Sequence, residues 1–419
     1  MRARALIQHA ERVWLLIGLL IALSGCTMAQ APLAFFVATP STGEAPLTVS
    51  FDASRSSDPD GTIAQYEWDF NGDGDVDATG VTASYKYTTP GVFIATLTVT
   101  DNAGLKGRFS ATITVSKSSI FFSAIRNGLP LPQIFRMDSD GMNQAQITYL
   151  QGADLWPALS PNGRQYVAFA RAALNFGGGG SPTGDFDIFK MLADGSMQIN
   201  LTQQSGSEEI QPTWSPDASK IAFASNKNGN FNIYKINADG TAWVPLTNFT
   251  AKGAFAPRWS PTNPNLLIFV TNNDTAPNAF DIWKINADGT GMANLTNRSG
   301  FNDGALSPIT HFPSPPSWSP DGTKIAFTSD QTGTLDIFIM NADGSNIVNL
   351  NTFASSSTAN LASSDEFDPF WLPNGNEIAF VSDRDGTYQI YKVSLSTGAV
   401  TKLTSIGTNM TPAKTPPNR

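Results

Sequence analysis

The chain of 419 residues contains one cysteine, Cys26, and two histidines, His9 and His311. No disulfide can form within one copy of the chain, and a zinc site of the usual cysteine and histidine ligands has too few of them. The apolar run of residues 13–23 is too short to cross about 30 Å of hydrocarbon as a helix. These shortages argue against a disulfide scaffold, a zinc centre and a helical membrane span.

Positive charge is scarce as well. Lysine and arginine number 26 against 35 aspartates and glutamates, and the formal net charge of −9 becomes −11 without residues 1–25. Nucleic acids and anionic lipid surfaces are bound by cations that neutralise phosphates. The charge balance therefore argues against both as partners.

The N-terminal segment combines a basic region, a short apolar run and the single cysteine. The run ends in Leu23-Ser24-Gly25-Cys26, and three arginines precede it: Arg2, Arg4 and Arg12. This arrangement resembles the signal peptide and lipobox of a bacterial lipoprotein. The resemblance implies that residues 1–25 are removed, that the thiol of Cys26 carries a diacylglycerol, and that residues 26–30 are a tether. Thr27 stands where an inner-membrane retention signal would usually have Asp, which favours the outer membrane, on its periplasmic or surface face. The alternative is an uncleaved anchor with an incidental cysteine.

Signals for helices are nearly absent from the rest of the chain. Short runs of alternating β-branched and aromatic residues recur between Asn-Gly, Asp-Gly and Ser-Pro turns. In residues 31–116 four such runs predict half-buried strands: 47–51, 65–70, 83–87 and 94–99. The sequence therefore predicts an all-β chain that begins, after its tether, with a small sandwich.

Motifs in the same segment resemble those of the PKD (polycystic kidney disease) domain. They are Phe51-Asp52-Ala53-Ser54, Ser57-Asp58-Pro59-Asp60-Gly61, Tyr66-Glu67-Trp68-Asp69-Phe70 and Tyr87-Thr88-Thr89-Pro90-Gly91. The resemblance implies an immunoglobulin-like extracellular module over residues 31–116, which usually serves as a spacer or a binding unit.

One loop of this module places oxygen-bearing side chains at every second residue: Asp69, Asn71, Asp73, Asp75 and Asp77. The intervening glycines let the backbone curl around a hard cation, and oxygen ligands suit calcium. The loop is a candidate calcium site, with Asp58 and Asp60 as further ligands from a neighbouring loop. A helical calcium loop would need an acid at Gly80, so that geometry does not transfer, and a plain hairpin turn is the alternative. We expect no other cofactor.

Two phrases alternate through residues 119–416. The first is Pro-x-Trp-Ser-Pro before an apolar strand. Its three full copies contain Trp214, Trp259 and Trp318, and two weaker copies lie at 157–161 and around Trp371. The second is an apolar strand that runs into Ala-Asp-Gly, with the acids Asp194, Asp239, Asp288 and Asp343 after an opening Asp140. Successive turns lie 45 to 55 residues apart, which is enough for a four-stranded sheet each. We interpret the tryptophans as packing between sheets and the Asp-Gly pairs as hairpin turns; ligand stacking on the tryptophans is the alternative.

The second phrase occurs six times and the first only five. The first unit starts at its second strand, 120–123, whereas residues 412–416 repeat the frame Pro-x-x-Thr-Pro at the end of the chain. We therefore predict a six-bladed β-propeller in which the C-terminal residues supply the innermost strand of the first blade; an open solenoid would need capping ends. The phrases resemble the PD40, or WD-like, repeats of TolB-type six-bladed propellers. Such propellers include binding platforms, peptidase gating domains and, in related architectures, lyases.

Three insertions break the period: 172–185, 299–315 and 353–368. The first lies between a second and a third strand and the others precede an innermost strand, so they could border different faces. Such loops often carry recognition, and solvated spacers are the alternative. His311 lies in the second insertion, without a Gly-x-Ser-x-Gly motif, and no pair of acids stands out by its setting, so we expect no catalytic site.

These expectations combine into a lipid-anchored envelope protein without enzymatic activity. Its propeller would bind a protein partner, with the PKD module as a spacer or secondary binding unit. A polysaccharide-binding protein is one alternative and should show exposed aromatic residues grouped on one face. A hydrolase or lyase is the other, and should show charged residues that converge in the central channel. TolB-type proteins carry a different N-terminal domain, so a role in a Tol–Pal system does not follow.

Overall fold

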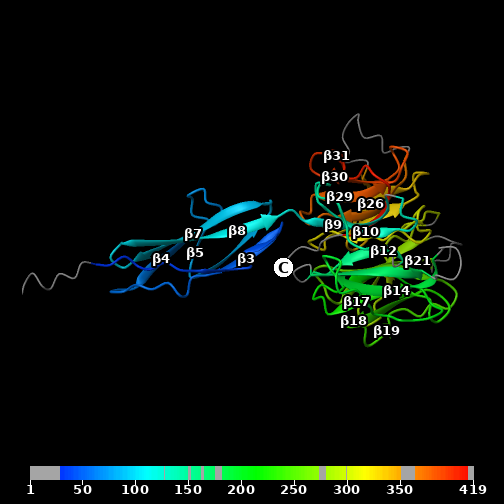
Figure 1. Cartoon of the computed structure of the whole chain (residues 1–419), viewed down its shortest axis with the longest axis horizontal. Coiled ribbons are helices and arrows are strands. Elements are labelled where there is room, and N and C mark those ends of the chain that lie inside the picture. The colour runs from blue at the N-terminus through cyan, green and yellow to red at the C-terminus, as the bar shows by residue number, and fades with distance from the viewer. Residues whose placement is uncertain are drawn as a thin grey trace, which may run out of the picture. The chain divides into compact units, whose positions relative to one another are not determined.

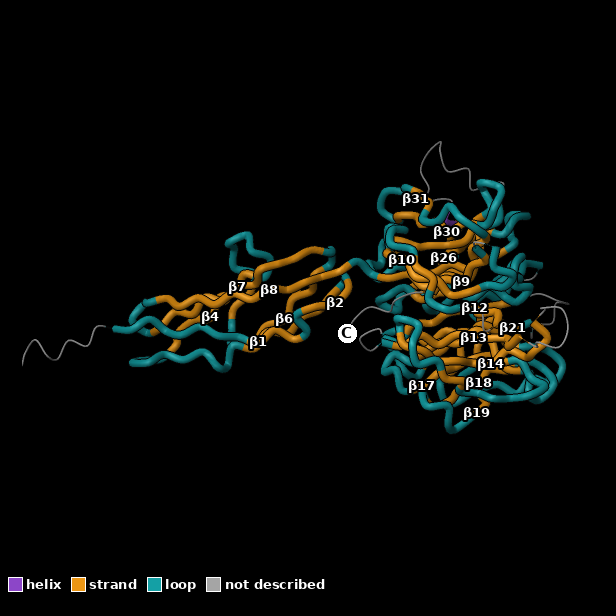
Figure 2. Tube along the Cα trace, in the orientation of Figure 1, coloured by secondary structure: helices purple, strands orange, loops and turns teal. Residues whose placement is uncertain are grey.

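The computed structural model describes residues 29–126, 128–149, 152–161, 165–174, 182–272, 280–298, 300–350 and 364–413. Strands account for nearly all of their regular secondary structure, which confirms the all-β prediction (Figures 1 and 2). None of the described residues forms a helix with the length and hydropathy needed to cross a membrane. The segment with the lipobox and Cys26 lies outside the described residues. The chain divides into two compact units.

The N-terminal unit is a sandwich of two sheets. One sheet has the order β1-β3-β6 and the other β2-β8-β7-β4-β5. All four predicted strands are present as β3, β4, β6 and β7, and four more surround them. The bounds are β1 Val37–Thr39, β2 Thr42–Glu44, β3 Leu47–Asp52, β4 Ile63–Asp69, β5 Ala78–Thr79, β6 Thr82–Tyr87, β7 Gly91–Asp101 and β8 Lys106–Ser116.

Aromatic side chains fill the core of this sandwich. Trp68 is fully buried, and its ring centroid lies 5.1 Å from that of Phe36 and 5.5 Å from that of Phe51. Its indole nitrogen donates a 2.8 Å hydrogen bond to the carbonyl of Gly80, so the one polar atom of the ring is satisfied. One face of β3 and one face of β7 cover this core, which explains why apolar and polar residues alternate along both strands.

The described part of residues 119–413 forms six four-stranded sheets, here called sheets 1 to 6. Sheet 1 has the order β32-β9-β10-β11, and the others run in chain order from the first strand to the fourth. Sheet 1 comprises β32 Thr408–Ala413, β9 Ser119–Ile125, β10 Gln133–Asp138 and β11 Ala145–Gln146. Sheet 2 comprises β12 Gly152–Leu159, β13 Tyr166–Leu174, β14 Pro182–Leu192 and β15 Ile199–Asn200. Sheet 3 comprises β16 Glu209–Trp214, β17 Lys220–Ser225, β18 Asn232–Asn237 and β19 Val244–Pro245. Sheet 4 comprises β20 Ala254–Trp259, β21 Leu266–Thr271, β22 Asp281–Asn286 and β23 Ala293–Asn294. Sheet 5 comprises β24 Ser317–Trp318, β25 Lys324–Ser329, β26 Asp336–Asn341 and β27 Val348–Asn349. Sheet 6 comprises β28 Glu366–Trp371, β29 Glu377–Ser382, β30 Gln389–Ser394 and β31 Val400–Lys402.

The predicted strand exchange between the ends of this unit is confirmed. Strand β32 pairs antiparallel with β9, with Asn409 opposite Ala124, and so supplies the missing first strand of sheet 1. The Arg126 side chain, just after β9, donates hydrogen bonds of 3.2 and 2.5 Å to the amide oxygen of Asn409. Backbone and side-chain bonds together therefore tie the last strand to the first part of the propeller.

The Asp-Gly turns connect the third and fourth strands and also contact the neighbouring sheet. The side chain of Asp239, for example, accepts hydrogen bonds from the backbone and hydroxyl of Thr241, which lowers the pKa of this carboxyl. A Cβ atom at the following Gly240 would lie 2.7 Å from the carbonyl oxygen of Leu201 in sheet 2. The same contact recurs in sheets 2, 4 and 5, and in sheet 1 the turn at Gly141 meets Leu403 of sheet 6. Sheet 1 therefore follows sheet 6 in the ring.

The four tryptophans of the first phrase are all buried at the ends of innermost strands. The indole nitrogen of Trp214 donates to the carbonyl of Ala158 in sheet 2 at 3.0 Å, and that of Trp318 donates to Arg258 of sheet 4 at 3.2 Å. Trp259 instead bonds within its own sheet, to the carbonyl of Pro264 at 2.8 Å. Two of these side chains therefore link neighbouring sheets through the backbone as well as by packing.

Each described innermost strand longer than two residues carries a β-bulge. The pairing with the second strand shifts register in sheets 1, 2, 3, 4 and 6, next to the proline of the first phrase. The residue before that proline has a positive φ in four of them: Trp156, Gln211, Ala256 and Asp368. A bulge redirects the side chain at this point, and these positions prove important for the interior of the ring.

The glycines of sheet 5 provide a test of the inter-sheet contact. Gly344 and Gly333 have nearly equal φ angles of +91° and +93°, but a Cβ at Gly344 would lie 2.4 Å from the carbonyl oxygen of Leu295, whereas nothing lies within 4 Å at Gly333. We expect Gly333→Ala to cost about 1 kcal/mol through backbone strain. Gly344→Ala should cost about 2 kcal/mol more, because the neighbouring sheet must move. Urea unfolding of both variants measures the difference; equal losses would contradict an inter-sheet role for the turn.

Candidate binding site at the loop end of the propeller

All six sheets are antiparallel, so each has one end at which the first strand begins, the second ends and the third begins. In sheet 3 this end is marked by the pairing of Glu209 with Ser225 and of Ser225 with Asn232. We call it the loop end. The described strand ends that flank the insertions 172–185 and 353–368 belong to it, as does the insertion ahead of β24. The expectation that the insertions could border different faces is therefore wrong, because up-and-down strands bring both kinds of connection to the same end.

The second insertion forms a hairpin, residues 303–316, which we call the axial hairpin. Asp303 begins it as a bridge to Ser329 of β25, and Leu306 pairs with Pro313. The backbone nitrogen of Ser314 donates to the carbonyl of Ala305 at 2.9 Å. The hairpin interrupts the innermost strand of sheet 5, which explains why β24 has only two residues.

The axial hairpin contacts sheets on the far side of the ring. The ring of Phe312 lies 5.5 Å from that of Trp156 in sheet 2, which stands opposite sheet 5. Gln211 of sheet 3 donates to the carbonyl of Pro313 at 2.8 Å, and the backbone nitrogen of Asp368 in sheet 6 donates to the hydroxyl of Ser314 at 2.9 Å. A segment that leaves sheet 5 and reaches sheets 2 and 3 must cross the axis of the ring. The hairpin therefore occupies the centre of the propeller.

The bulged positions explain these contacts. Gln211 and Asp368 both have the positive φ described above; Gln211 meets the hairpin across the axis, and Asp368 meets it from the adjacent sheet 6. Arg258 of sheet 4 also belongs to this interior: burial lowers the pKa of its guanidinium to about 10, and the charge of Asp368 opposes that effect. Charged residues do converge near the axis, as a channel enzyme would require, but the backbone of Asp368 is bonded to the hairpin there.

Aromatic side chains surround the hairpin at the loop end. Phe231 and Phe280 stand just before the third strands of sheets 3 and 4, Phe186 takes the corresponding place within the longer β14 of sheet 2, and Phe255 lies in β20. Ring centroids are 5.6 Å apart for Trp156 and Phe186, 5.9 Å for Phe231 and Phe312, 4.9 Å for Phe231 and Phe255, and 6.3 Å for Phe255 and Phe280. We call this connected set the aromatic belt. All of its members except the buried Trp156 are half-buried.

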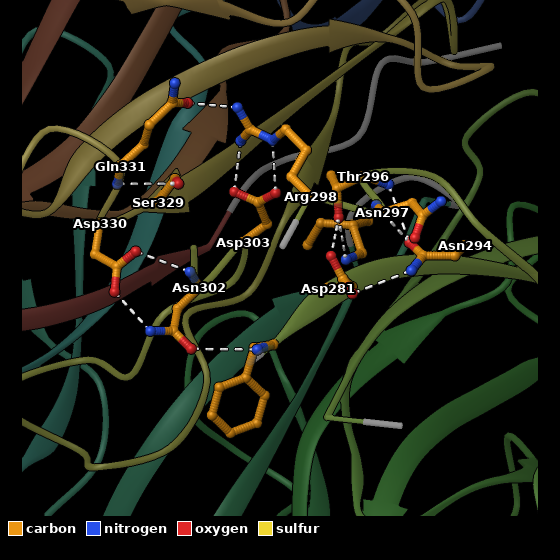
Figure 3. Close-up of polar contacts among 12 residues, drawn as sticks. Asp281, Asn294, Thr296, Asn297, Arg298, Asn302, Asp303, Ser329, Asp330 and Gln331 are labelled. Carbon is orange, nitrogen blue, oxygen red and sulfur yellow. Dashed lines mark hydrogen bonds and ion pairs between the residues drawn. The ribbon is translucent and has the colours of Figure 1, made fainter. Parts of the chain in front are cut away.

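A pocket of about 460 Å³ lies between sheets 4 and 5 at this end. Its walls mix apolar and polar side chains: Asn272, Phe280, Asn302, Ala305, Leu306, Asp330 and Leu335. Asn302 fixes one side, because its backbone and side-chain nitrogens donate to the two carboxylate oxygens of Asp330 at 2.8 and 2.6 Å (Figure 3). Its amide oxygen accepts a 3.2 Å bond from the backbone nitrogen of Phe280.

An ion pair anchors the hairpin beside this pocket. Arg298 donates to both oxygens of the buried Asp303 carboxylate, at 3.0 and 2.6 Å, and also to the side chain of Gln331 (Figure 3). The opposite charges of Arg298 and Asp303 thereby compensate each other. The pocket is therefore a by-product of the insertion, which supplies Asn302, Ala305 and Leu306 to its wall.

Acidic residues repeat at the start of the innermost strands, which sequence reasoning missed. Asp154, Glu209 and Glu366 are buried there, and the buried Asp303 takes the corresponding place at the start of the axial hairpin, where it bridges Ser329 as Glu209 pairs with Ser225. Asp154 is paired with Arg171 at 2.5 Å and Glu366 with Arg384 at 3.3 Å. Burial raises the pKa of Glu209 to about 7 and that of Glu366 to about 8, against the lowering effect of nearby serine hydroxyls. The signal was present in the sequence as an acid three residues before the proline at 157, 212 and 369.

Comparisons with known families agree with this architecture. Residues 180–312 and 309–419 match the family model described as TolB beta propeller domain, over more than half of the chain. Residues 29–116 match the PKD domain. The chain belongs to the TolB beta propeller domain family. The family resemblance predicted from the repeats is thereby confirmed, and so is the PKD module.

Solved structures with this fold include TolB from Acinetobacter baumannii, with a TM-score of 0.54 and 17% identity over 78% of this chain and 80% of the other. A TolB-type protein from Agrobacterium tumefaciens gives a TM-score of 0.51 and 17% identity, over 71% of this chain and 94% of the other. Collagenase ColA from Clostridium perfringens is 46% identical over 56 residues, which are 13% of this chain and 5% of that protein. The propeller likeness shows a shared fold, and the collagenase match is confined to a small part of that protein.

The single histidine of the TolB beta propeller domain lies in the second insertion. His311 lies in the axial hairpin with an exposed side chain and a φ of +59°. Its backbone nitrogen donates to the carbonyl of Ser307 at 2.9 Å, and no hydrogen bond or ion pair of its ring is found among the described residues. The prediction of a loop residue fits this setting.

In the PKD domain, the candidate calcium loop is closed by its own hydrogen bonds. Asp69 accepts bonds from the backbone nitrogens of Gly72 and Gly74 at 2.7 and 3.0 Å, and Asp77 accepts one from Phe70 at 2.7 Å. Asn71 and Asp73 bond to each other, and Asp73 also accepts from the backbone of Asp75 at 2.9 Å. Among the described residues no three acids, histidines or cysteines gather as a metal site. Calcium binding by this loop stays a prediction.

The buried Glu366 predicts how stability depends on pH. Its pKa is 4.5 in an ordinary setting and about 8 in the folded protein, so between these values the folded state holds a proton that the unfolded chain has lost. Stability therefore falls as the pH rises from about 5 to 8, by at most about 1.4 kcal/mol per pH unit for such a group.

Glu366→Gln should flatten this slope, since glutamine keeps an acceptor for Ser364 and Ser382 but does not titrate. Urea unfolding at pH 5.5 and 8 measures the slope, with Glu377→Gln at the other end of the same sheet as the control. If Glu366→Gln retains the slope of the unaltered protein, the proton is not bound at this residue.

Proposed function

We propose that this chain is a lipid-anchored cell-envelope binding protein whose propeller recognises a protein partner at the loop end. The PKD domain serves as a spacer or a secondary binding unit, and the anchor at Cys26 places both at the outer membrane, on its periplasmic or surface face. The observation that carries the proposal is the axial hairpin. Because it fills the centre of the ring, a ligand meets the loop end with its aromatic belt and pocket rather than an open channel.

The limited exposure of the rings in the aromatic belt favours a protein over a polysaccharide as the ligand. Sugar rings stack on exposed aromatic faces, but Phe231 and Phe255 are half-buried and turned toward other rings. The large hydrophobic residue most exposed on the axial hairpin is Leu306, with 46% of its surface accessible. An aliphatic tip beside a partly polar pocket suits the side chains of a protein partner. A polysaccharide-binding role therefore remains the second candidate.

The hydrolase or lyase alternative has weaker support. Arg258 and Asp368 meet near the axis, but the backbone of Asp368 is bonded to the hairpin that fills this region. A substrate would have to displace the hairpin and its contacts with sheets 2, 3 and 6 before reaching them.

Site-specific crosslinking in cells tests the proposal. A photoreactive amino acid at position 306 should give one discrete adduct with a protein, and the adduct should diminish in a Cys26→Ala strain, because the untethered chain is no longer held at the membrane. The control is the same label at Met197, which is 67% exposed in the Asp-Gly turn region at the opposite end. Mass spectrometry identifies the crosslinked protein. An equal adduct from both positions, or none above background at 306, would sink the proposal.

A further inference from the structure

We infer that the pocket between sheets 4 and 5 receives an arginine or lysine side chain, flanked by apolar residues, from the protein partner. This inference rests on the proposed function and names the chemistry by which the loop end selects its partner. It depends on the position of one carboxylate, on the apolar walls around it and on the room between them.

The charge of Asp330 is not needed for the fold. In four sheets the residue after the second strand accepts a hydrogen bond from the backbone just ahead of the innermost strand. Asn226 accepts from Glu208 at 2.8 Å, Asn272 from Gly253 at 2.9 Å, Asp330 from Asn302 at 2.8 Å and Asp383 from Asp365 at 3.0 Å. Sheets 3 and 4 make this bond with a neutral amide. A carboxylate at position 330 therefore brings a charge that the bond does not require.

This charge also has no cation of its own among the described residues. The nearby Arg298 is engaged by both oxygens of Asp303, and Asp330 is bonded only to the neutral Asn302. By contrast, the buried Asp154 and Glu366 each have an arginine partner. Asp330 is half-buried in the pocket wall, so a cation that entered the pocket would be shielded from bulk water and held more strongly than at an open surface.

The remaining walls suit the stem of a long cationic side chain. Phe280, Leu306 and Leu335 provide apolar surface, and an aromatic ring can hold a guanidinium over its face. A pocket of about 460 Å³ has room for such a side chain and part of its neighbours. The net charge of −9 favours the approach of a basic segment.

Three short peptides test the inference on the full chain in detergent. They are acetylated and amidated Gly-Leu-X-Leu-Gly, with arginine, glutamine or glutamate at X, and binding is measured by isothermal titration calorimetry at low and high salt. We expect affinity to fall in the order arginine, glutamine, glutamate, with a strong dependence on salt for arginine. Asp330→Asn should weaken the arginine peptide about tenfold and leave the glutamine peptide nearly unchanged.

Asp383→Asn is the matched control, because it makes the same backbone bond in sheet 6 outside the pocket and should leave all affinities unchanged. Both variants should fold, since asparagine already occupies this position in sheets 3 and 4. As a second variant, Leu306→Ala removes an exposed apolar wall and should weaken the arginine and glutamine peptides alike.

Equal binding of the arginine and glutamine peptides would overturn the inference, as would equal effects of the two aspartate variants. Binding of maltotriose or chitotriose in place of all three peptides would overturn it in favour of a glycan. The crosslinking result separates the two levels. If position 306 gives an adduct but the peptides do not bind in the order arginine, glutamine, glutamate, the proposed function stands and the inference about the pocket is wrong. If the peptides bind in that order but no adduct forms, the pocket binds a cationic side chain and the proposed function is wrong.

Discussion

The backbone pairing of β32 with β9 is the interaction on which the rest of the propeller depends. It completes sheet 1 and joins residues 283 positions apart, as the bonds from Arg126 to Asn409 illustrate. With sheet 1 complete, the turn at Gly141 packs on Leu403 of sheet 6 in the same way that each later Asp-Gly turn packs on the sheet before it. A closed ring has a fixed axis, and only a fixed axis allows Trp156, Gln211 and Asp368 to meet a hairpin that begins in sheet 5.

The axial hairpin changes what the ring can do. A regular propeller has a channel along its axis, and charged groups that point into it could serve binding or chemistry. Here the carbonyl of Pro313 accepts a hydrogen bond from Gln211 across the axis, the hydroxyl of Ser314 accepts one from the backbone of Asp368 in the adjacent sheet 6, and Phe312 adds its ring to the aromatic belt. The interior is thereby converted from a passage into a core. Recognition shifts to the end surface, where the same insertion forms one wall of a pocket.

Much of this architecture is visible in the sequence, for a physical reason. Repeated phrases predict the six sheets, and the absence of one motif at the start together with its copy at residues 412–416 predicts the strand exchange, since each sheet needs four strands. The site is less predictable. Nothing in residues 303–316 indicates that they cross the axis, because that path depends on contacts with three other sheets. The role of Asp330 becomes apparent only when it is compared with Asn226, Asn272 and Asp383 at the same place in other sheets.

The buried acids could be predicted from the sequence only in part. Asp154, Glu209 and Glu366 stand at a fixed distance before a proline, so their repetition could be read from the sequence. Their protonation could not, because it depends on the depth of burial and on whether a cation lies nearby. The same holds for the candidate calcium loop, where the spacing of acids is plain but their carboxylates accept bonds from the backbone of their own loop.

The strand exchange also sets the order in which the molecule can be made. The strands of the PKD domain are all present once Ser116 has been synthesised, whereas sheet 1 lacks its innermost strand until residues 408–413 exist. Contacts between such distant residues close slowly, because a long loop must be ordered before they form. The first sheet of the propeller to be synthesised is therefore the last to be finished, and until then its partly formed edge is open to other strands. A chain with this topology has the greatest need of protection from aggregation between the synthesis of its first and its last propeller strand.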